Sequence, residues 1–135
     1  MKPVASSRGR GIRLLGKNAK VRKKENYLVS EYLTKPHLIN GLKYDLRLYV
    51  VVTSLFPLRI YLYREGLVRF ATEPYKVVKE NLGQRFMHLT NYSVNKKSQN
   101  FVRNSDPNQD GVGNKWSLRA LALKFAELNI PIAPV

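Results

Sequence analysis

Charged and apolar residues alternate in one strand-like run, and this run constrains the fold more than any other part of the chain. Lys43, Asp45 and Arg47 stand at alternate positions between residues 43 and 52, and the positions between them are apolar or aromatic. Successive side chains of a strand point to opposite faces, so the three charges share one face. The later residues 49–52 are bulky and β-prone on both faces, as in a central strand, where charges need partners. These residues leave two interpretations open, a solvated edge or a polar ligand site.

Length and composition restrict the class of protein. The chain has 135 residues, of which 44% are hydrophobic, about the size of one domain or a large part of one. No run approaches the roughly 18 apolar residues of a membrane span, and no apolar signal region follows the basic N-terminus. We therefore expect a soluble protein that does not bind membranes. The absence of cysteine excludes disulfides, zinc-thiolate sites and a cysteine nucleophile.

The net charge predicts an acidic partner. The chain carries 24 Lys and Arg against 9 Asp and Glu, a formal charge of +15. Nucleic acid, an anionic membrane and an acidic protein would all be attracted. Between Lys2 and Lys24 there are only basic charges, which favours a solvated and partly disordered arm. Nucleic acid is the less favoured partner, because the first aromatic residue of the chain is Tyr27 and none is interleaved with these charges.

Hydrophobic periodicity predicts an α+β fold. Short strands are expected at residues 12–15 and 27–33, and a long strand at 44–54. Residues 58–64 and 67–72 alternate well and are expected to form a hairpin that turns at Glu65-Gly66. Residues 116–129 fit an amphipathic helix that Pro131 ends. Residues 98–113 read as a loop, and their Asp106–Gly111 run lacks the acidic spacing of a calcium site.

Two segments have the composition of a ligand site. Residues 2–11 begin with Lys2 and continue as a loop rich in small residues. Small side chains let backbone N–H groups approach phosphate oxygens. Residues 86–97 concentrate hydroxyls, amides and His88. A lone histidine is more often a hydrogen-bonded structural residue than a ligand or base, and only its context can reverse that reading.

Taken together, these segments resemble the tubulin tyrosine ligase-like family of ATP-grasp amino-acid ligases. Four blocks occur in the family's order: Lys2–Ile12, Val29–Ile39, Lys43–Arg47 and Met87–Ser93. The linking segment Ile60–Phe70 is similar to the family as well. Within the family, the amino-acid sequences of residues 2–11 and 91–97 are most similar to those of the tubulin polyglutamylases. The resemblance implies the central portion of an ATP-grasp fold, a mixed or antiparallel sheet with flanking helices. We expect residues 1–135 to be part of such a domain, with its N-terminal domain and its C-terminal metal-binding segment missing.

The resemblance also implies roles for individual residues. ATP is expected to contact Lys2, Arg8, Gly9, Ser30, Glu31, Tyr32, Leu33, Lys43, Asp45, Thr90 and Asn91. The incoming glutamate is expected to contact Arg69, Ser93 and Lys115, and Arg8 to reach the acceptor protein. Arg8, Arg47 and Arg69 are expected to neutralise charge during catalysis. No metal ligand is expected in this chain, and the Mg²⁺ carboxylates are expected in the missing segment.

The implied function is ATP-dependent addition of glutamate to side-chain carboxylates of acidic tubulin tails through an acyl phosphate. The partners would be tubulin tails or microtubules and free L-glutamate, and the location the cytoplasm and its microtubule cytoskeleton, with a cilium or basal body as one such place. The basic run Lys17–Lys24 is expected to capture the acidic tail. One alternative is a catalytically inactive module that binds tubulin. On charge alone, a nucleic-acid binder is a third reading.

Overall fold

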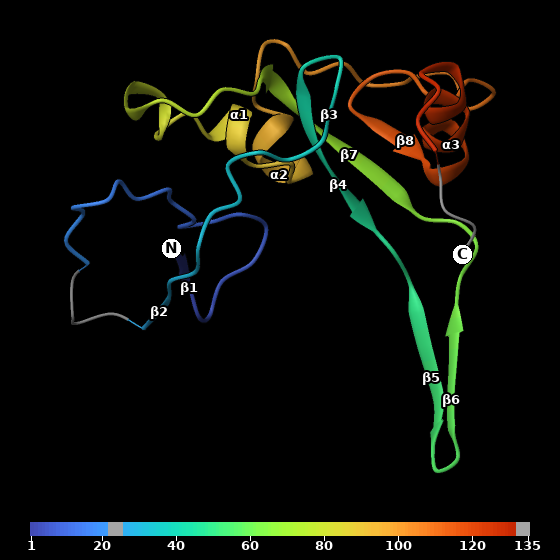
Figure 1. The fold of residues 1–135 in the computed structure, drawn as a ribbon. Helices are drawn as coiled ribbons and strands as arrows, with labels where there is room; N and C mark the ends of the chain where they lie inside the picture. Colours follow the sequence, from blue (N-terminus) through green and yellow to red (C-terminus); the bar gives the residue numbers. More distant parts are fainter. Residues whose placement is uncertain (22–25, 132–135) are drawn as a thin grey trace. The chain divides into compact units, whose positions relative to one another are not determined.

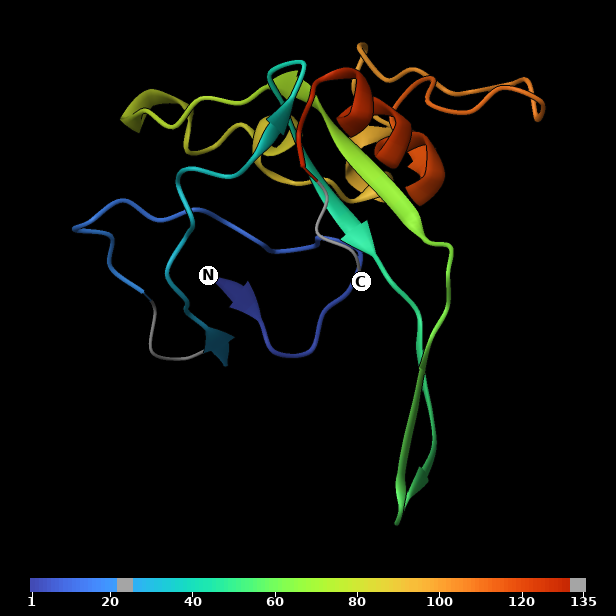
Figure 2. The same ribbon diagram turned by 45° about the vertical axis from the view of Figure 1, so that its right-hand side comes forward.

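The computed structural model describes residues 1–21 and 26–131. The chain divides into two compact units, and each is described by itself. Unit 1 comprises Met1–Tyr44 and Ala71–Phe101, and unit 2 comprises Asp45–Phe70 and Val102–Val135. Figures 1 and 2 show the course of the chain in two views. No helix among the described residues is long and apolar enough to cross a membrane.

Short strands and short helices alternate along the chain. The strands are β1 (Lys2–Pro3), β2 (Tyr27–Leu28), β3 (Leu38–Ile39), β4 (Leu42–Arg47), β5 (Val50–Leu55), β6 (Leu58–Leu62), β7 (Leu67–Pro74) and β8 (Lys115–Ser117). The helices are the 3₁₀ turn η1 (Lys79–Asn81), α1 (Arg85–His88), α2 (Tyr92–Asn95) and α3 (Leu118–Glu127). The main sheet has the order β3-β4-β7-β8, and β1-β2 and β5-β6 form separate pairs. The pairs β1/β2, β3/β4, β5/β6 and β7/β8 are antiparallel. The chain is therefore a mixed α+β structure with antiparallel sheets, as the periodicity predicts.

In unit 1, a buried asparagine connects strand β7 to helix α2. Asn95 is 1% exposed. Its Oδ1 accepts hydrogen bonds from the backbone N–H and the hydroxyl of Thr72, both at 3.0 Å. Its Nδ2 donates to the carbonyls of Leu89 at 2.6 Å and Asn91 at 3.2 Å. Because a buried amide needs all of these partners, Asn95 fixes the segment 89–95 beside β7.

In unit 2, helix α3 buries part of its apolar face, while its Leu123 is 60% exposed, and the helix begins at the N-cap residue Ser117. Ala120 and Leu121 of the helix are buried, as is Val68 of β7. The Ser117 hydroxyl accepts from the N–H of Ala120 at 3.0 Å and donates to the carboxylate of Asp110. Burial raises the pKa of Asp110, but the hydrogen bonds from Ser117 and from the Gly111 N–H outweigh it and lower that pKa. The loop before the helix is thereby tied to its first turn.

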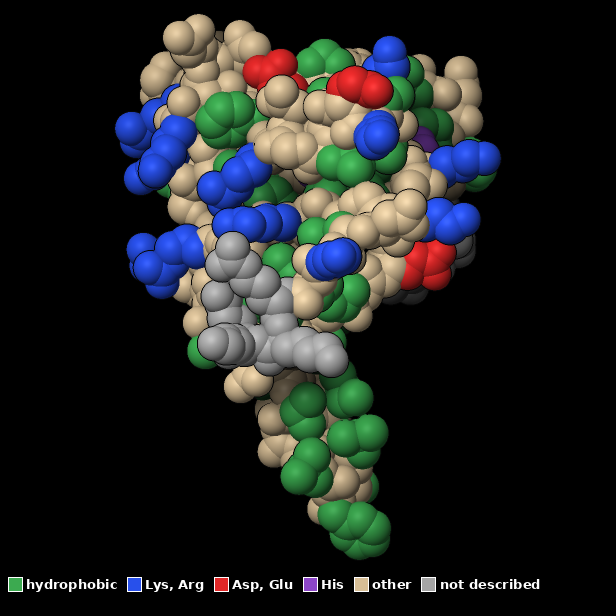
Figure 3. Space-filling view, turned by 90° about the vertical axis from the view of Figure 1, so that its left-hand side faces the viewer, with side chains coloured by type: hydrophobic (Ala, Val, Ile, Leu, Met, Phe, Trp, Pro, Cys, Tyr) green, Lys and Arg blue, Asp and Glu red, His purple; other side chains and the backbone are tan. Residues whose placement is uncertain are grey.

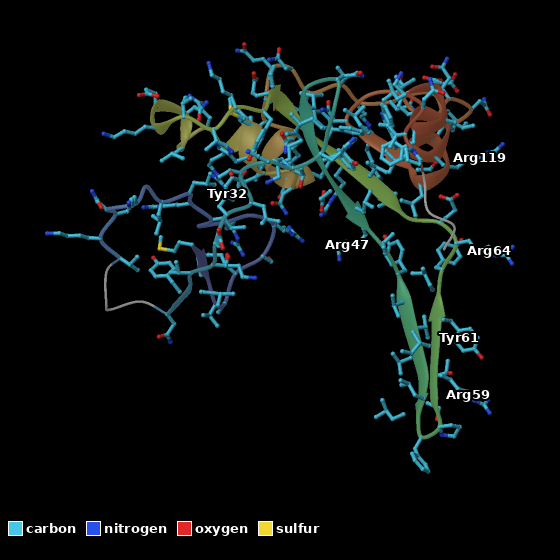
Figure 4. The ribbon with its side chains drawn as sticks, in the orientation of Figure 1. Tyr32, Arg47, Arg59, Tyr61, Arg64 and Arg119 are labelled. Carbon is cyan, nitrogen blue, oxygen red and sulfur yellow. The ribbon has the colours of Figure 1, made fainter. Side chains whose placement is uncertain are left out.

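Strands β5 and β6 form an antiparallel hairpin, the β5–β6 ribbon, which is exposed on both faces. Val50 pairs with Leu62, Val52 with Ile60 and Leu55 with Leu58, so all six side chains share one face. These six aliphatic residues are between 50 and 81% exposed. Figure 3 shows apolar side chains along the ribbon, and Figure 4 shows Arg59 and Tyr61 of β6 directed to the same side.

The structure corrects the predicted hairpin. The strand at 58–62 pairs with the preceding strand β5, and the chain turns at Phe56-Pro57, whereas Glu65-Gly66 only connects β6 to β7. The alternation of both segments is real, but it does not specify which neighbour a strand pairs with. Pro57 lies in the turn itself, between Leu55 of β5 and Leu58 of β6.

Four other predicted elements also differ from the structure. Residues 12–15 form no strand, and they line two pockets of unit 1. The strand predicted at 27–33 is limited to Tyr27–Leu28, and the one predicted at 44–54 is interrupted between Arg47 and Val50. Helix α3 begins at Leu118, since Lys115–Ser117 pairs with β7. The loop predicted at 98–113 is confirmed as free of helix and strand.

Candidate active site

A pocket of about 500 Å³ in unit 1, here called the lysine pocket, brings together five residues for which the sequence predicts nucleotide contacts. They are Lys2, Ser30, Glu31, Tyr32 and Lys43, and they come from β1, from the segment after β2 and from β4. The pairing of Lys2 with Leu28 in β1/β2 brings the first lysine beside the 30–32 segment. Leu33, the residue that follows Tyr32 in this predicted set, is 79% exposed and is not among the lining residues.

Lys43 is held in this pocket by a chain of hydrogen bonds. Its Nζ donates to the Tyr32 hydroxyl and to the His88 carbonyl, both at 3.1 Å. The Tyr32 hydroxyl also lies 3.1 Å from His88 Nδ1, and His88 Nε2 lies 3.0 Å from the carbonyl of Asn81. The position of Lys43 is therefore fixed by side chains and backbone from three other segments of unit 1.

Aromatic rings surround the same ammonium group. Lys43 Nζ lies 4.7 Å from the ring centroid of Tyr32 and 5.9 Å from that of Tyr75. The His88 ring meets both tyrosine rings edge to face at 5.8 Å. Burial, and then hydrogen bonding with Tyr75, raises the pKa of Tyr32. Burial and the charge of Lys43 lower the pKa of His88, although its bond to Asn81 acts the other way. Both groups are therefore neutral at physiological pH.

The loop before residue 12 is anchored to helices α1 and α2 through its backbone. The Ser93 hydroxyl donates to the Arg8 carbonyl and Arg85 Nη2 donates to the Gly9 carbonyl, both at 2.8 Å. Gly9 has φ +75°, and a methyl group in its place would lie 2.8 Å from Asn91 Oδ1. Only glycine fits this close approach without strain.

A basic cleft of about 780 Å³, also in unit 1, opens beside this loop. Five cations line it: Arg8, Arg10, Arg85, Lys96 and Lys97. Its lining includes the Ser93 side chain, for which the sequence predicts a glutamate contact, and contains no carboxylate. The face drawn in Figure 3 carries far more Lys and Arg than Asp and Glu side chains. The cleft is suited to an anionic group.

In unit 2, strands β4, β7 and β8 bring together three further residues of the predicted site. Arg69 Nε donates to Asp45 Oδ1 at 2.9 Å, and its Nη2 is paired with Asp45 Oδ2. Lys115 lies directly opposite Arg69 in the β7/β8 pair, so the two side chains start from the same face. The hydrogen bond with Asp45 raises the pKa of Arg69. A predicted nucleotide contact thus neutralises a predicted glutamate contact.

The three alternating charges of β4 differ in burial and in hydrogen-bond partners. Lys43 and Asp45 are half-buried and partnered, whereas Arg47 is exposed (Figure 4). Leu46, on the apolar side, is 45% exposed. Neither reading of this run holds throughout. Strand β4 pairs with β3 only at Leu42 and Lys43, and two of its charges make polar contacts, whereas Arg47 is exposed. The central position expected for residues 49–52 is wrong, because Val50–Val52 belong to the two-stranded β5–β6 ribbon.

Some predicted site residues lie outside the lysine pocket, and some residues that line the basic cleft were not predicted from the sequence. Thr90 and Asn91 are half-buried in the segment before α2, where the Asn91 side chain lies close to Gly9. Sequence reasoning missed the anchoring role of Arg85 and the cleft position of Lys96 and Lys97. Their only signal is that they flank the 87–93 block. In the basic run Lys17–Lys24, residues 22–24 lie outside the described residues, and Lys17 and Lys20 are exposed.

The described residues 1–21 and 26–131 contain no group of three or more His, Cys, Asp or Glu side chains that could hold a metal ion. Asp45 is paired with Arg69 and Glu31 lines the lysine pocket, so they do not form a joint ligand set. The described residues therefore do not fit a Mg²⁺ site.

The chain belongs to the tubulin-tyrosine ligase family, which it matches over residues 1–131. The more specific similarity is to tubulin glutamylases. The chain is 54% identical over 121 residues to tubulin polyglutamylase TTLL5 of Mus musculus, covering 90% of this chain and 9% of that protein. It is 52% identical over 121 residues to tubulin monoglutamylase TTLL4 of Homo sapiens, covering 90% and 10%. For tubulin polyglutamylase ttll-5 of Caenorhabditis elegans the identity is 44% over 128 residues, covering 94% and 17%. The chain thus spans about a tenth to a sixth of the length of these relatives.

Proposed function

We propose that this chain supplies the nucleotide-binding and glutamate-binding parts of an ATP-dependent ligase that adds glutamate to acidic tubulin tails. The observation that carries the proposal is the lysine pocket, where five residues of the expected nucleotide set converge. The glutamylase names of the relatives support the choice of amino acid and acceptor. In this proposal the main sheet and its helices form the central portion of an ATP-grasp domain, and residues 1–135 are a part of that domain.

In the first step of the proposed reaction, a side-chain carboxylate oxygen of the acceptor attacks the γ-phosphorus of ATP. An acyl phosphate forms and ADP leaves. Lys2 and Lys43 would bind the phosphates or the base from the walls of the pocket, and main-chain groups of 30–33 would contact the adenine. The Arg8-Gly9 loop would cover the phosphates. Transfer of this kind depends on positioning and on neutralised charge rather than on a protein nucleophile.

In the second step, the amine of free glutamate attacks the acyl carbon, an amide bond forms as the C–O bond to phosphate breaks, and the phosphate leaves with the proton that the amine loses. Arg69 and Lys115 would hold carboxylates of the incoming glutamate, since a guanidinium pairs with a carboxylate through two hydrogen bonds. The present pairing of Arg69 with Asp45 has this same two-bond geometry. Arg47 would add positive charge to this group, and the family resemblance implies Ser93 as a further glutamate contact.

Binding of ATP to the 135-residue chain, followed by amide chemical shifts, tests the nucleotide assignment. We expect perturbations around the lysine pocket and weaker binding, by about tenfold, for Lys2→Ala and Lys43→Ala, because each removes a charged contact. Lys124→Ala is the matched control, since Lys124 pairs with Glu127 on α3. Equal effects of Lys43→Ala and Lys124→Ala would refute the assignment.

The charge of +15 favours a second candidate, a module that binds acidic tails without catalysis. A chimera separates the two, in which this chain replaces the matching segment of mouse TTLL5. Incorporation of labelled glutamate into tubulin, lost on Arg69→Ala but kept on Arg59→Ala, supports the ligase. Tubulin binding by the chimera with no incorporation supports the module.

A further inference from the structure

His88 is a buried titratable residue for which the proposed reaction has no use. It is 2% exposed, yet its residue contributes to the lining of the lysine pocket and of a neighbouring pocket of about 430 Å³ in unit 1. The side chain contacts Tyr32 and Asn81, and its carbonyl contacts Lys43. A histidine in such a place determines where the protons of its neighbours lie.

The hydrogen-bond partners decide each proton position in turn. The Asn81 carbonyl can only accept, so His88 Nε2 carries the proton and Nδ1 presents a lone pair. The Lys43 ammonium can only donate, so the Tyr32 oxygen accepts from it. The Tyr32 hydroxyl proton is then directed at His88 Nδ1. The chain runs in one direction, from Lys43 to Tyr32 to His88 to Asn81.

We propose that His88 is a positioning residue of the nucleotide site. By accepting the Tyr32 hydroxyl proton at Nδ1, it turns an oxygen lone pair toward Lys43 and fixes the ammonium at the wall of the lysine pocket. This inference rests on the proposed function, because it takes that pocket to be the nucleotide site. A fixed lysine loses less side-chain entropy when the nucleotide binds, so the preorganised site has the higher affinity.

Two substitutions of His88 separate the two ring nitrogens. His88→Asn keeps an acceptor two bonds from Cβ, at the place of Nδ1, whereas His88→Gln keeps an amide donor three bonds from Cβ, at the place of Nε2. Tyr32→Phe removes only the hydroxyl and keeps the ring next to Lys43. The double variant Tyr32→Phe with His88→Gln completes a thermodynamic cycle.

The experiment measures ATP affinity of the 135-residue chain and its variants by titration, and the tautomer of His88 by ¹⁵N NMR of the imidazole. We expect the Nε2–H tautomer in the wild type. Affinity should stay within about threefold for His88→Asn and fall about tenfold for His88→Gln and for Tyr32→Phe, with no further loss in the double variant. Amide spectra establish which variants are folded, and the tautomer requires no variant.

Several results would overturn the proposal: a proton on Nδ1, a folded His88→Gln variant with unchanged affinity, or additive losses in the double variant. Failure of every form to bind ATP, wild type included, would refute the nucleotide assignment of the pocket and this role with it. The tautomer would then still decide whether the hydrogen-bond chain exists. Unchanged affinity in a folded His88→Gln variant, with intact ATP binding by the wild type, would refute the role of His88 and leave the nucleotide assignment of the pocket standing.

Discussion

Substitution of three glycines by alanine tests how the Arg8-Gly9 loop is held. Gly9 has φ +75°, and an added methyl group would lie 2.8 Å from Asn91 Oδ1 and 3.1 Å from Val94 Cγ2. Gly41 has φ +74° with nothing within 4 Å of the methyl position. Gly83 has open space there and no positive φ. The three sites therefore separate the cost of backbone conformation from the cost of the close contact.

The expected losses follow from these two terms. Gly83→Ala should change the free energy of unfolding by at most about 1 kcal/mol, in the stabilising direction if the backbone accepts alanine. Gly41→Ala should cost about 1–2 kcal/mol for the left-handed conformation alone. Gly9→Ala should cost about 2–5 kcal/mol, because overpacking against Asn91 and Val94 adds about 1–3 kcal/mol.

Urea unfolding followed by circular dichroism measures all three variants against wild type. The geometry requires that the loss of unfolding free energy be largest for Gly9→Ala, smaller for Gly41→Ala and smallest for Gly83→Ala. ATP titration adds a functional readout, since displacement of the loop should weaken binding for Gly9→Ala only. A loss for Gly9→Ala no larger than for Gly41→Ala would show that the contact with Asn91 does not restrain the loop.

Other predictions concern stability and association. Asn95→Ala should cost about 3 kcal/mol, because it leaves several buried partners without hydrogen bonds, whereas Asn100→Ala, which removes one exposed bond to Glu73, should change the unfolding free energy by less than about 0.5 kcal/mol; equal losses in urea unfolding would contradict this. The lowered pKa of His88 means that the unfolded chain binds the proton more tightly, so stability contributed by neutral His88 is complete above pH about 6.5 and is lost as the pH falls below it. Urea midpoints at pH 7.5 and 5.5 should differ less in His88→Asn, and a wild type more stable at the lower pH would show the sign to be wrong. Ile60→Glu should reduce concentration-dependent self-association of the chain in analytical ultracentrifugation, because it places a charge on the aliphatic face of the β5–β6 ribbon; unchanged association would exclude that face.

The sequence predicted element types better than their pairing. The helix near residues 118–127 and the strands at 50–55 and 58–62 follow from apolar spacing, which is a local property of the chain. The hairpin was assigned to the wrong neighbours because alternation is equally strong in β6 and β7, and pairing depends on turn geometry. The short strands β1 and β3 carry no periodicity at all, since two residues are too few to show one.

The site was predicted through resemblance more than through patterns of residue type. Composition alone indicated that Lys43 and Asp45 need partners, but it could not name Tyr32, His88 or Arg69, which lie far away in sequence. For His88, residue type alone favours a structural role, whereas in the structure its ring contacts the pocket residue Tyr32. Such long-range partners become visible only when the chain has folded, because neither spacing nor charge encodes them.

The β5–β6 ribbon has a consequence for the life of the chain in a cell. Its tip residue Phe56 is 98% exposed, and the aliphatic face beside it is of the kind that chaperones and proteases recognise as a sign of incomplete folding. We expect chaperones and proteases to recognise this surface whether or not the lysine pocket is formed. The steady-state abundance of the chain should therefore follow whatever covers the ribbon, and changes at Val52 or Ile60 should alter turnover of the protein in cells before they alter its chemistry.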